Sequence, residues 1–251
     1  MKTTERHRLK ENELVYMIEQ ALGLLGPNRR LALTILGVAI LVGAAAGGYF
    51  IRRASVNGKA AALLGEAMTV MEMPVSTAPA PVPGQSATPP PPPAPGSYAS
   101  ERAKLEAALA KFLAAAEGYP KTDAGLSARY QAGGALTMLG RPADAAKRFQ
   151  EVMDLAESNS IYAEMARLGK ANAEAQTAKF DDAIKTYTDL SNNKDGDLPP
   201  DAMLMQLGRT YLLAGKTLEA RTAFKRLLDE YPSSQFAAEA QREVDQLNQT
   251  S

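Results

Sequence analysis

The chain has 251 residues with 28 basic and 28 acidic side chains, so no net charge indicates nucleic acid as a partner. It has no cysteine and one histidine, His7, which excludes disulfides, thiolate metal sites, clusters of histidine ligands and catalysis by cysteine or histidine. Aromatic residues make up only 6% and tryptophan is absent, a composition that favours closely packed helices over a β-sandwich. We therefore expect an all-α protein that is not an enzyme and holds no metal or cofactor.

The first 30 residues form a short charged tail. Within it, residues 9–25 place leucine or isoleucine at spacings of four, four and three, at Leu14, Ile18, Leu22 and Leu25. This periodicity predicts an amphipathic helix.

Residues 31–51 are 21 consecutive residues without a charge, and paired arginines stand on both sides, at 29–30 and 52–53. A helix rises about 1.5 Å per residue, so this stretch can cross a hydrocarbon core of roughly 30 Å and predicts one transmembrane helix. The tail, residues 1–30, holds six basic side chains, and a large domain follows the span. Both features favour a cytoplasmic N-terminus and an exported C-terminal domain.

The predicted span contains a GxxxG pattern formed by Gly43 and Gly47, which allows another helix to pack closely. We expect a packing face there, either for another membrane protein or for a second copy of this chain. The alternative to a permanent anchor is a signal sequence cleaved near Ala46, within an A-x-A-like site. The apolar run continues past that site to Ile51, which favours an uncleaved anchor.

Two contrasting segments follow the span. Residues 52–73 are alanine-rich and predict a juxtamembrane helix, whereas residues 74–97 hold ten of the sixteen prolines. Because proline lacks the amide donor that a helix needs, we expect residues 74–97 to be a polyproline II linker that reaches about 75 Å at most. The sequence leaves open whether residues 54–73 pack onto the domain beyond this linker.

The remaining domain, residues 98–251, is internally periodic. Its aromatic residues Phe112, Phe149, Tyr187 and Phe224 are separated by 37, 38 and 37 positions, and four residues before each stands an alanine: Ala108, Ala145, Ala183 and Ala220. Periods of this size are typical of stacked helical hairpins. The alanine lets two helix backbones approach, and the aromatic ring fills the space between neighbouring hairpins. We expect repeats near residues 100–122, 126–159, 164–197 and 201–234, and a capping helix over 235–248.

Small residues and prolines mark the hairpin turns and ends. Gly140, Ala178 and Gly215 each precede one of the repeated alanines by five residues. Glycine allows the chain to leave a helix in a conformation closed to most residues. Pro120 and Pro232 end second helices, because the residue before proline avoids helical geometry.

Residues 201–234 resemble a tetratricopeptide repeat, whose signature positions are occupied by Leu204, Leu207, Gly208, Tyr211, Gly215, Ala220, Phe224 and Pro232. Leu204 replaces the tryptophan of the family, and the units at 126–159 and 164–197 match less fully. The resemblance implies an α-solenoid with a concave protein-binding face formed by Tyr130, Gln131, Thr137, Asn172, Met205, Arg209 and Leu212. This mixture suits an extended or partly unfolded apolar segment. The alternative interpretation is that these residues only pack the interior of the superhelix.

The layout as a whole resembles the membrane-anchored ancillary subunit of the bacterial SecYEG translocon: a short charged tail, one uncleaved span, divergent repeats and no cysteine. The resemblance implies a single-pass protein of the bacterial inner membrane with its repeats in the periplasm. Its partners would be translocon subunits, exported proteins or periplasmic chaperones. The proline-rich segment departs from the family. The alternative function is a self-associating scaffold of the cell envelope or of division, without a chaperone role.

Overall fold

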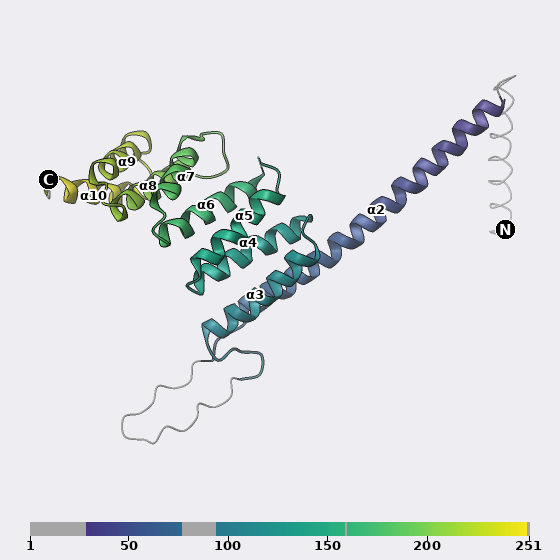
Figure 1. Ribbon diagram of the computed structural model, residues 1–251, viewed down its shortest axis with the longest axis horizontal. Helices are drawn as coiled ribbons and strands as arrows, with labels where there is room; N and C mark the ends of the chain where they lie inside the picture. The colour runs from purple at the N-terminus through teal and green to yellow at the C-terminus, as the bar shows by residue number, and fades with distance from the viewer. Residues whose placement is uncertain (1–28, 77–93, 159, 250–251) are drawn as a thin grey trace, which may run out of the picture. The chain divides into compact units, whose positions relative to one another are not determined.

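A computed structural model describes residues 29–76, 94–158 and 160–249 (Figure 1). Within these ranges the regular secondary structure is helical, and the only β-type pairing is one isolated bridge. The expected all-α fold class is confirmed. The amphipathic helix expected over residues 9–25 lies outside the described residues.

The chain divides into two compact units, residues 1–55 and 56–251. Helix α2, Arg29–Glu72, begins in the first unit and ends in the second. In the first unit its large apolar side chains are exposed, from 48% at Leu33 to 74% at Ile51. The described part of the chain holds one helix long and apolar enough to cross a membrane, with a mean hydropathy of 2.0 over its most apolar window. A membrane span and a signal sequence share these properties.

In the second unit, helices follow one another as antiparallel neighbours (Figure 1). Three hairpins come from the helix pairs α4 (Asp123–Met138) and α5 (Pro142–Leu155), α6 (Ile161–Gln176) and α7 (Phe180–Asn192), and α8 (Pro200–Leu213) and α9 (Thr217–Glu230). Helix α3 (Glu101–Gly118) precedes them, and α10 (Ala237–Gln249) packs against α9 after them.

Helix α3 packs against the C-terminal part of α2. Ala67 and Val70 of α2 belong to the same buried cluster as Leu109 and Phe112 of α3. Lys111 Nζ also lies 3.1 Å from Glu66 Oε2. Residues 56–72 of α2 thus pack on the first repeat, a point that the sequence leaves open.

The two flanks of the proline-rich segment lie side by side. Val75 and Tyr98 form a parallel bridge, in which the Tyr98 amide donates to the Pro74 carbonyl at 3.0 Å and the Ser76 amide donates to the Tyr98 carbonyl at 2.8 Å. Of the expected polyproline II linker, residues 77–93 lie outside the described residues, and only its two flanks are described. The hydrophobic contact between α2 and α3 brings the flanks together, because it buries apolar surface that each helix alone would leave in water.

Two kinds of start recur among the helices. Serine or threonine caps α3, α4 and α6, at Ser100, Thr122 and Ser160, and each hydroxyl accepts a hydrogen bond from the backbone amide three residues on. The second helices α5, α7 and α9 instead follow tight turns at residues with positive φ: Gly140 (73°), Ala178 (59°) and Gly215 (72°). Local sequence therefore sets both the helix boundaries and the hairpin turns.

The repeated alanines and aromatics form the interior. Ala108, Ala145, Ala183 and Ala220 have no exposed surface, and the four aromatics that follow them are at most 4% exposed. The interior separates into two clusters, one drawn from α2 to α6 and the other from α6 to α10. Helix α6 contributes to both, through Ala166 and Ala173 to the first and through Ala171 to the second.

Candidate functional site

The seven residues expected on the concave face come from the first helices of the three hairpins, and all are at least partly buried. On α4, the Tyr130 ring lies against the Phe149 ring, with 5.4 Å between centroids, and burial raises the pKa of Tyr130 above its ordinary value. Thr137 donates its hydroxyl hydrogen to the Gly133 carbonyl at 3.0 Å, and Gln131 is half-buried.

The other four residues are also engaged within the protein. Met205 has no exposed surface and lies in the second cluster, on which the partly buried Leu212 packs. Asn172 Oδ1 accepts the Tyr187 hydroxyl at 2.6 Å, and Arg209 Nη2 lies 2.6 Å from Glu239 Oε1. Met205 therefore packs the interior and offers no surface to a partner in this conformation. None of the seven lines any of the three pockets that lie between hairpins.

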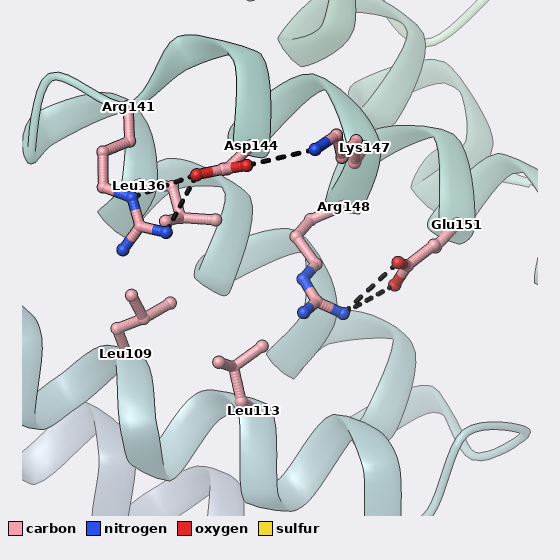
Figure 2. A pocket seen from close by; sticks show the side chains of 8 residues that line it. All are labelled: Leu109, Leu113, Leu136, Arg141, Asp144, Lys147, Arg148 and Glu151. Carbon is pink, nitrogen blue, oxygen red and sulfur yellow. Dashed lines mark hydrogen bonds and ion pairs between the residues drawn. The ribbon is translucent and has the colours of Figure 1, made fainter.

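Each of these pockets is formed by the second helix of one repeat and both helices of the next. The first has a volume of about 250 Å³ and lies between α3, α4 and α5 (Figure 2). Its apolar lining is Leu109 and Leu113, which form the floor in Figure 2, and Leu136, which lies beside Arg141. Its rim is charged and is formed by Arg141, Asp144, Lys147, Arg148 and Glu151. We call it the arginine-rimmed pocket.

Ion pairs hold the rim of this pocket in place (Figure 2). Asp144 accepts from Arg141 at 2.8 and 3.1 Å and from Lys147 at 3.3 Å. The hydrogen bond from Arg141, and then that from Lys147, lowers the pKa of Asp144 below its ordinary value. Asp144 therefore stays negatively charged at neutral pH between two cations.

A second group of charges lies beside the first. Arg148 Nη1 donates to both carboxylate oxygens of Glu151, at 3.0 and 3.3 Å. Glu151 also accepts from Arg129, which is only 8% exposed and donates to the Ala116 carbonyl at 3.0 Å. The buried Arg129 thus anchors Glu151, and Glu151 in turn orients Arg148 over the leucine floor.

Two further pockets occupy the same place in the following repeats. Five lining positions of the arginine-rimmed pocket recur 38 residues later in the second pocket and 75 residues later in the third. Tyr187 and Phe224 follow Phe149 at the same two distances along the chain. For example, Leu136, Glu174 and Tyr211 are equivalent, as are Lys147, Lys185 and Thr222. The second, the balanced pocket of about 360 Å³, is lined by three cations and three carboxylates. The third, the apolar pocket of about 300 Å³, includes Leu204, Leu207 and Leu218 and one residue of each charge.

Sequence reasoning did not identify these pockets. One signal was available, because Asp144, Lys147, Arg148 and Glu151 stand at spacings of three, four and seven and therefore share one face of a helix. Such a face is ordinarily solvated, and the leucines that convert it into a pocket belong to other helices. Within the described ranges, no group of three or more His, Cys, Asp or Glu side chains could hold a metal ion.

Gly43 and Gly47 of the predicted span lie on α2 in the first unit. A β-carbon added at either residue would meet nothing within 4 Å. The helix surface at both glycines is thus open in the structure.

Comparison with known proteins supports the fold. Residues 201–234 match the family model of the tetratricopeptide repeat. The chain is similar to a structure of nearly identical TPR-like repeats of a putative kinesin light chain from Podosopora anserina, with 14% identity and a TM-score of 0.51, over 58% of this chain and 78% of that one. A tetratricopeptide repeat protein from Parabacteroides merdae is similar with a TM-score of 0.48 and 14% identity, over 59% of this chain and 55% of that one. MamA is similar with a TM-score of 0.48 and 14% identity, over 59% of this chain and 78% of that one. No curated protein matches the chain.

The family match and the likeness to the kinesin light chain repeats agree with the observed hairpins. Tetratricopeptide repeats stack into solenoids and present extended surfaces for protein–protein interaction. The second unit is accordingly a tetratricopeptide-like α-solenoid.

Proposed function

We propose that this protein is a membrane-anchored scaffold that binds other proteins through its tetratricopeptide-like solenoid. The observation that carries the proposal is the combination, in one chain, of an exposed apolar helix segment with stacked repeats that leave pockets between them. The exposed large apolar side chains between Leu31 and Ile51 are costly in water and stable in a bilayer.

The proposed location is the bacterial inner membrane, with residues 31–51 as an uncleaved span, the N-terminus in the cytoplasm and the repeats in the periplasm. Six basic residues precede the apolar run and three, Arg52, Arg53 and Lys59, follow it closely. Large domains cross the membrane largely regardless of their own charge, so the tail is the stronger determinant.

The proposed partners are exported proteins, subunits of the Sec translocon or periplasmic chaperones. Repeat surfaces can hold extended segments, and a tether near the membrane would raise their local concentration. A self-associating envelope scaffold is the second candidate. The open helix surface at Gly43 and Gly47 favours it, since small residues there would admit a second copy.

Photocrosslinking in intact cells separates the two candidates. A photoreactive residue at Met138 or Leu218, which are 61% and 67% exposed, would report partners of the repeats. A photoreactive residue at Ile40, which is 63% exposed, would report partners of the apolar helix. We expect translocon subunits, exported chains or chaperones from Met138 and Leu218. Self-crosslinks alone, from every position, would instead establish the structural scaffold.

Protease treatment of spheroplasts tests the topology. We expect the repeats to be degraded and a small membrane-embedded N-terminal fragment to remain. If the repeats survived until the membrane was lysed, the domain would be cytoplasmic and the periplasmic role would fail. A mature chain beginning near Gly47 would identify a cleaved signal sequence.

A further inference from the structure

The arginine-rimmed pocket differs from the two equivalent pockets in its charge. Its lining carries three cations, Arg141, Lys147 and Arg148, and two carboxylates, Asp144 and Glu151. These side chains form two groups of ion pairs, Arg141–Asp144–Lys147 and Arg129–Glu151–Arg148, the second of which includes the buried Arg129 behind the lining. The balanced pocket has equal numbers of each sign, and so does the apolar pocket. An excess of positive charge is therefore particular to this one position of the repeat among the three pockets.

The hydrogen bonds to Asp144 and Glu151 use only some of the N–H groups of Arg141 and Arg148. A guanidinium carries five N–H groups. Among the described residues, the rim hydrogen bonds of Arg148 come from Nη1 and those of Arg141 from Nε and Nη2. Figure 2 shows both guanidinium groups above the leucine floor, Arg141 over Leu109 and Arg148 over Leu113. A ligand carboxylate could accept further charge-assisted hydrogen bonds from either group.

The leucines of the pocket favour a ligand that is partly apolar. Leu109 and Leu136 are 7% and 3% exposed, and Leu113 is half-buried, so packed leucines form the apolar part of the lining. A volume of about 250 Å³ admits one aliphatic side chain and leaves the charged groups at the rim. The best-matched ligand is thus aliphatic at its centre and anionic at its edges.

Resting on the proposed protein-binding function, we propose that the arginine-rimmed pocket binds an acidic peptide segment of a partner protein. One leucine-like side chain of the segment lies on the floor, and acidic side chains on either side of it contact the two groups of ion pairs. Because the Arg141 and Lys147 side chains are 54% and 75% exposed, this contact is strongly weakened by salt.

The test uses the full-length chain in detergent micelles and short fluorescent peptides that are acetylated and amidated at their ends. One peptide carries Glu-Leu-Glu in a glycine and serine background, and the comparison peptides carry Gln-Leu-Gln and Glu-Gly-Glu. Fluorescence anisotropy gives the Kd of each at low and at physiological salt. We expect the Glu-Leu-Glu peptide to bind about tenfold or more tightly than either comparison peptide, an advantage that shrinks as salt rises.

Two charge-removing variants localise the binding. The double change Arg141→Gln and Arg148→Gln should raise the Kd about tenfold or more, since it removes the donors above the floor. The matched double change Arg167→Gln and Lys185→Gln removes two cations from the balanced pocket and should change the Kd less than about twofold. Circular dichroism checks that each variant folds. Lys147→Glu is a further test, because this side chain is 75% exposed and the change reverses a rim charge without altering the interior. This variant should also bind the Glu-Leu-Glu peptide more weakly.

The proposal is overturned if Gln-Leu-Gln binds as well as Glu-Leu-Glu, or if the two double variants weaken binding equally. It is also overturned if only peptides with a free C-terminal carboxylate bind, since the ligand would then be a chain end. A negative peptide result together with protein crosslinks from Met138 or Leu218 would reject this pocket and leave the general protein-binding function standing. Absence of any partner crosslink would reject that function itself.

Discussion

The ring of Phe149 lies directly against the backbone of Gly133: a β-carbon at residue 133 would stand 2.6 Å from the Cε1 atom of the ring. On α6, a β-carbon at Gly169 would stand 2.7 Å from the same atom. The aromatic ring of α5 therefore fills the space between two hairpins only because both neighbouring positions lack a side chain.

We expect Gly133→Ala to lower the free energy of unfolding by about 1–3 kcal/mol, because the added methyl group overpacks the ring of a 4% exposed phenylalanine. Gly134→Ala is the matched control, because Gly134 belongs to the same helix and a β-carbon there would meet nothing within 4 Å. That change should stabilise the protein by roughly 0.5–1 kcal/mol, as alanine favours a helix over glycine. Urea titration monitored by circular dichroism measures both, and equal effects would contradict the packing described.

Ala178 occupies the turn position that Gly140 and Gly215 fill elsewhere, with a φ of 59°. A side chain in this region is strained by about 1–2 kcal/mol, whereas glycine is not. We expect Ala178→Gly to stabilise the protein by roughly 0.5–1 kcal/mol, after the greater freedom of glycine in the unfolded chain is subtracted. Ala238→Gly, at an exposed position within α10, should instead destabilise it by a similar amount. Loss of stability in both variants would contradict the strain at residue 178.

The Tyr187 hydroxyl is buried and donates to Asn172 at 2.6 Å. Burial, and then the negative charge of Glu174, raises the pKa of Tyr187 above its ordinary value of 10.0. The folded protein thus holds this proton more tightly than the unfolded chain. Its contribution to stability is complete below pH 10 and is lost as the pH rises from there towards the raised pKa. We expect the free energy of unfolding to fall above about pH 10.

Tyr187→Phe should make this alkaline fall less steep and, at pH 8, should cost about 1 kcal/mol for the lost hydrogen bond to Asn172. Urea midpoints measured at several pH values for both proteins give the two slopes. Parallel curves for the wild type and the variant would show that ionisation of Tyr187 is not coupled to folding.

The two interior clusters predict two zones of stability in the solenoid. Phe149→Ala and Phe224→Ala remove equivalent rings from the first and the second cluster, each at a cost of about 3–5 kcal/mol. Because repeats contact mainly their neighbours, we expect Phe149→Ala to speed amide hydrogen exchange chiefly in α4 to α6, and Phe224→Ala chiefly in α8 to α10. Uniform acceleration along the whole solenoid in both variants would establish a single cooperative interior.

The fold class could be predicted because its determinants repeat along the chain. The aromatic residues with an alanine four positions earlier mark the interior of each hairpin, and all four such alanines are fully buried. Gly140 and Gly215 adopt the positive φ that the turns require. The apolar run of residues 31–51 needs only its length and lack of charge to be recognised. Each of these signals lies within a few turns of a single helix or hairpin.

The tertiary structure decided which segments meet across longer separations. It joined α3 to the end of α2 through Ala67 and Phe112, and so placed Val75 beside Tyr98 at the two flanks of the proline-rich segment. It also buried Met205 in the second cluster, where the side chain has no exposed surface. It also placed the charged face of α5 above Leu109 and Leu113 of α3, which turned an ordinary solvated face into the arginine-rimmed pocket. Spacing along one helix shows which side chains share a face, but the surface opposite that face depends on how separate helices pack to bury their apolar area.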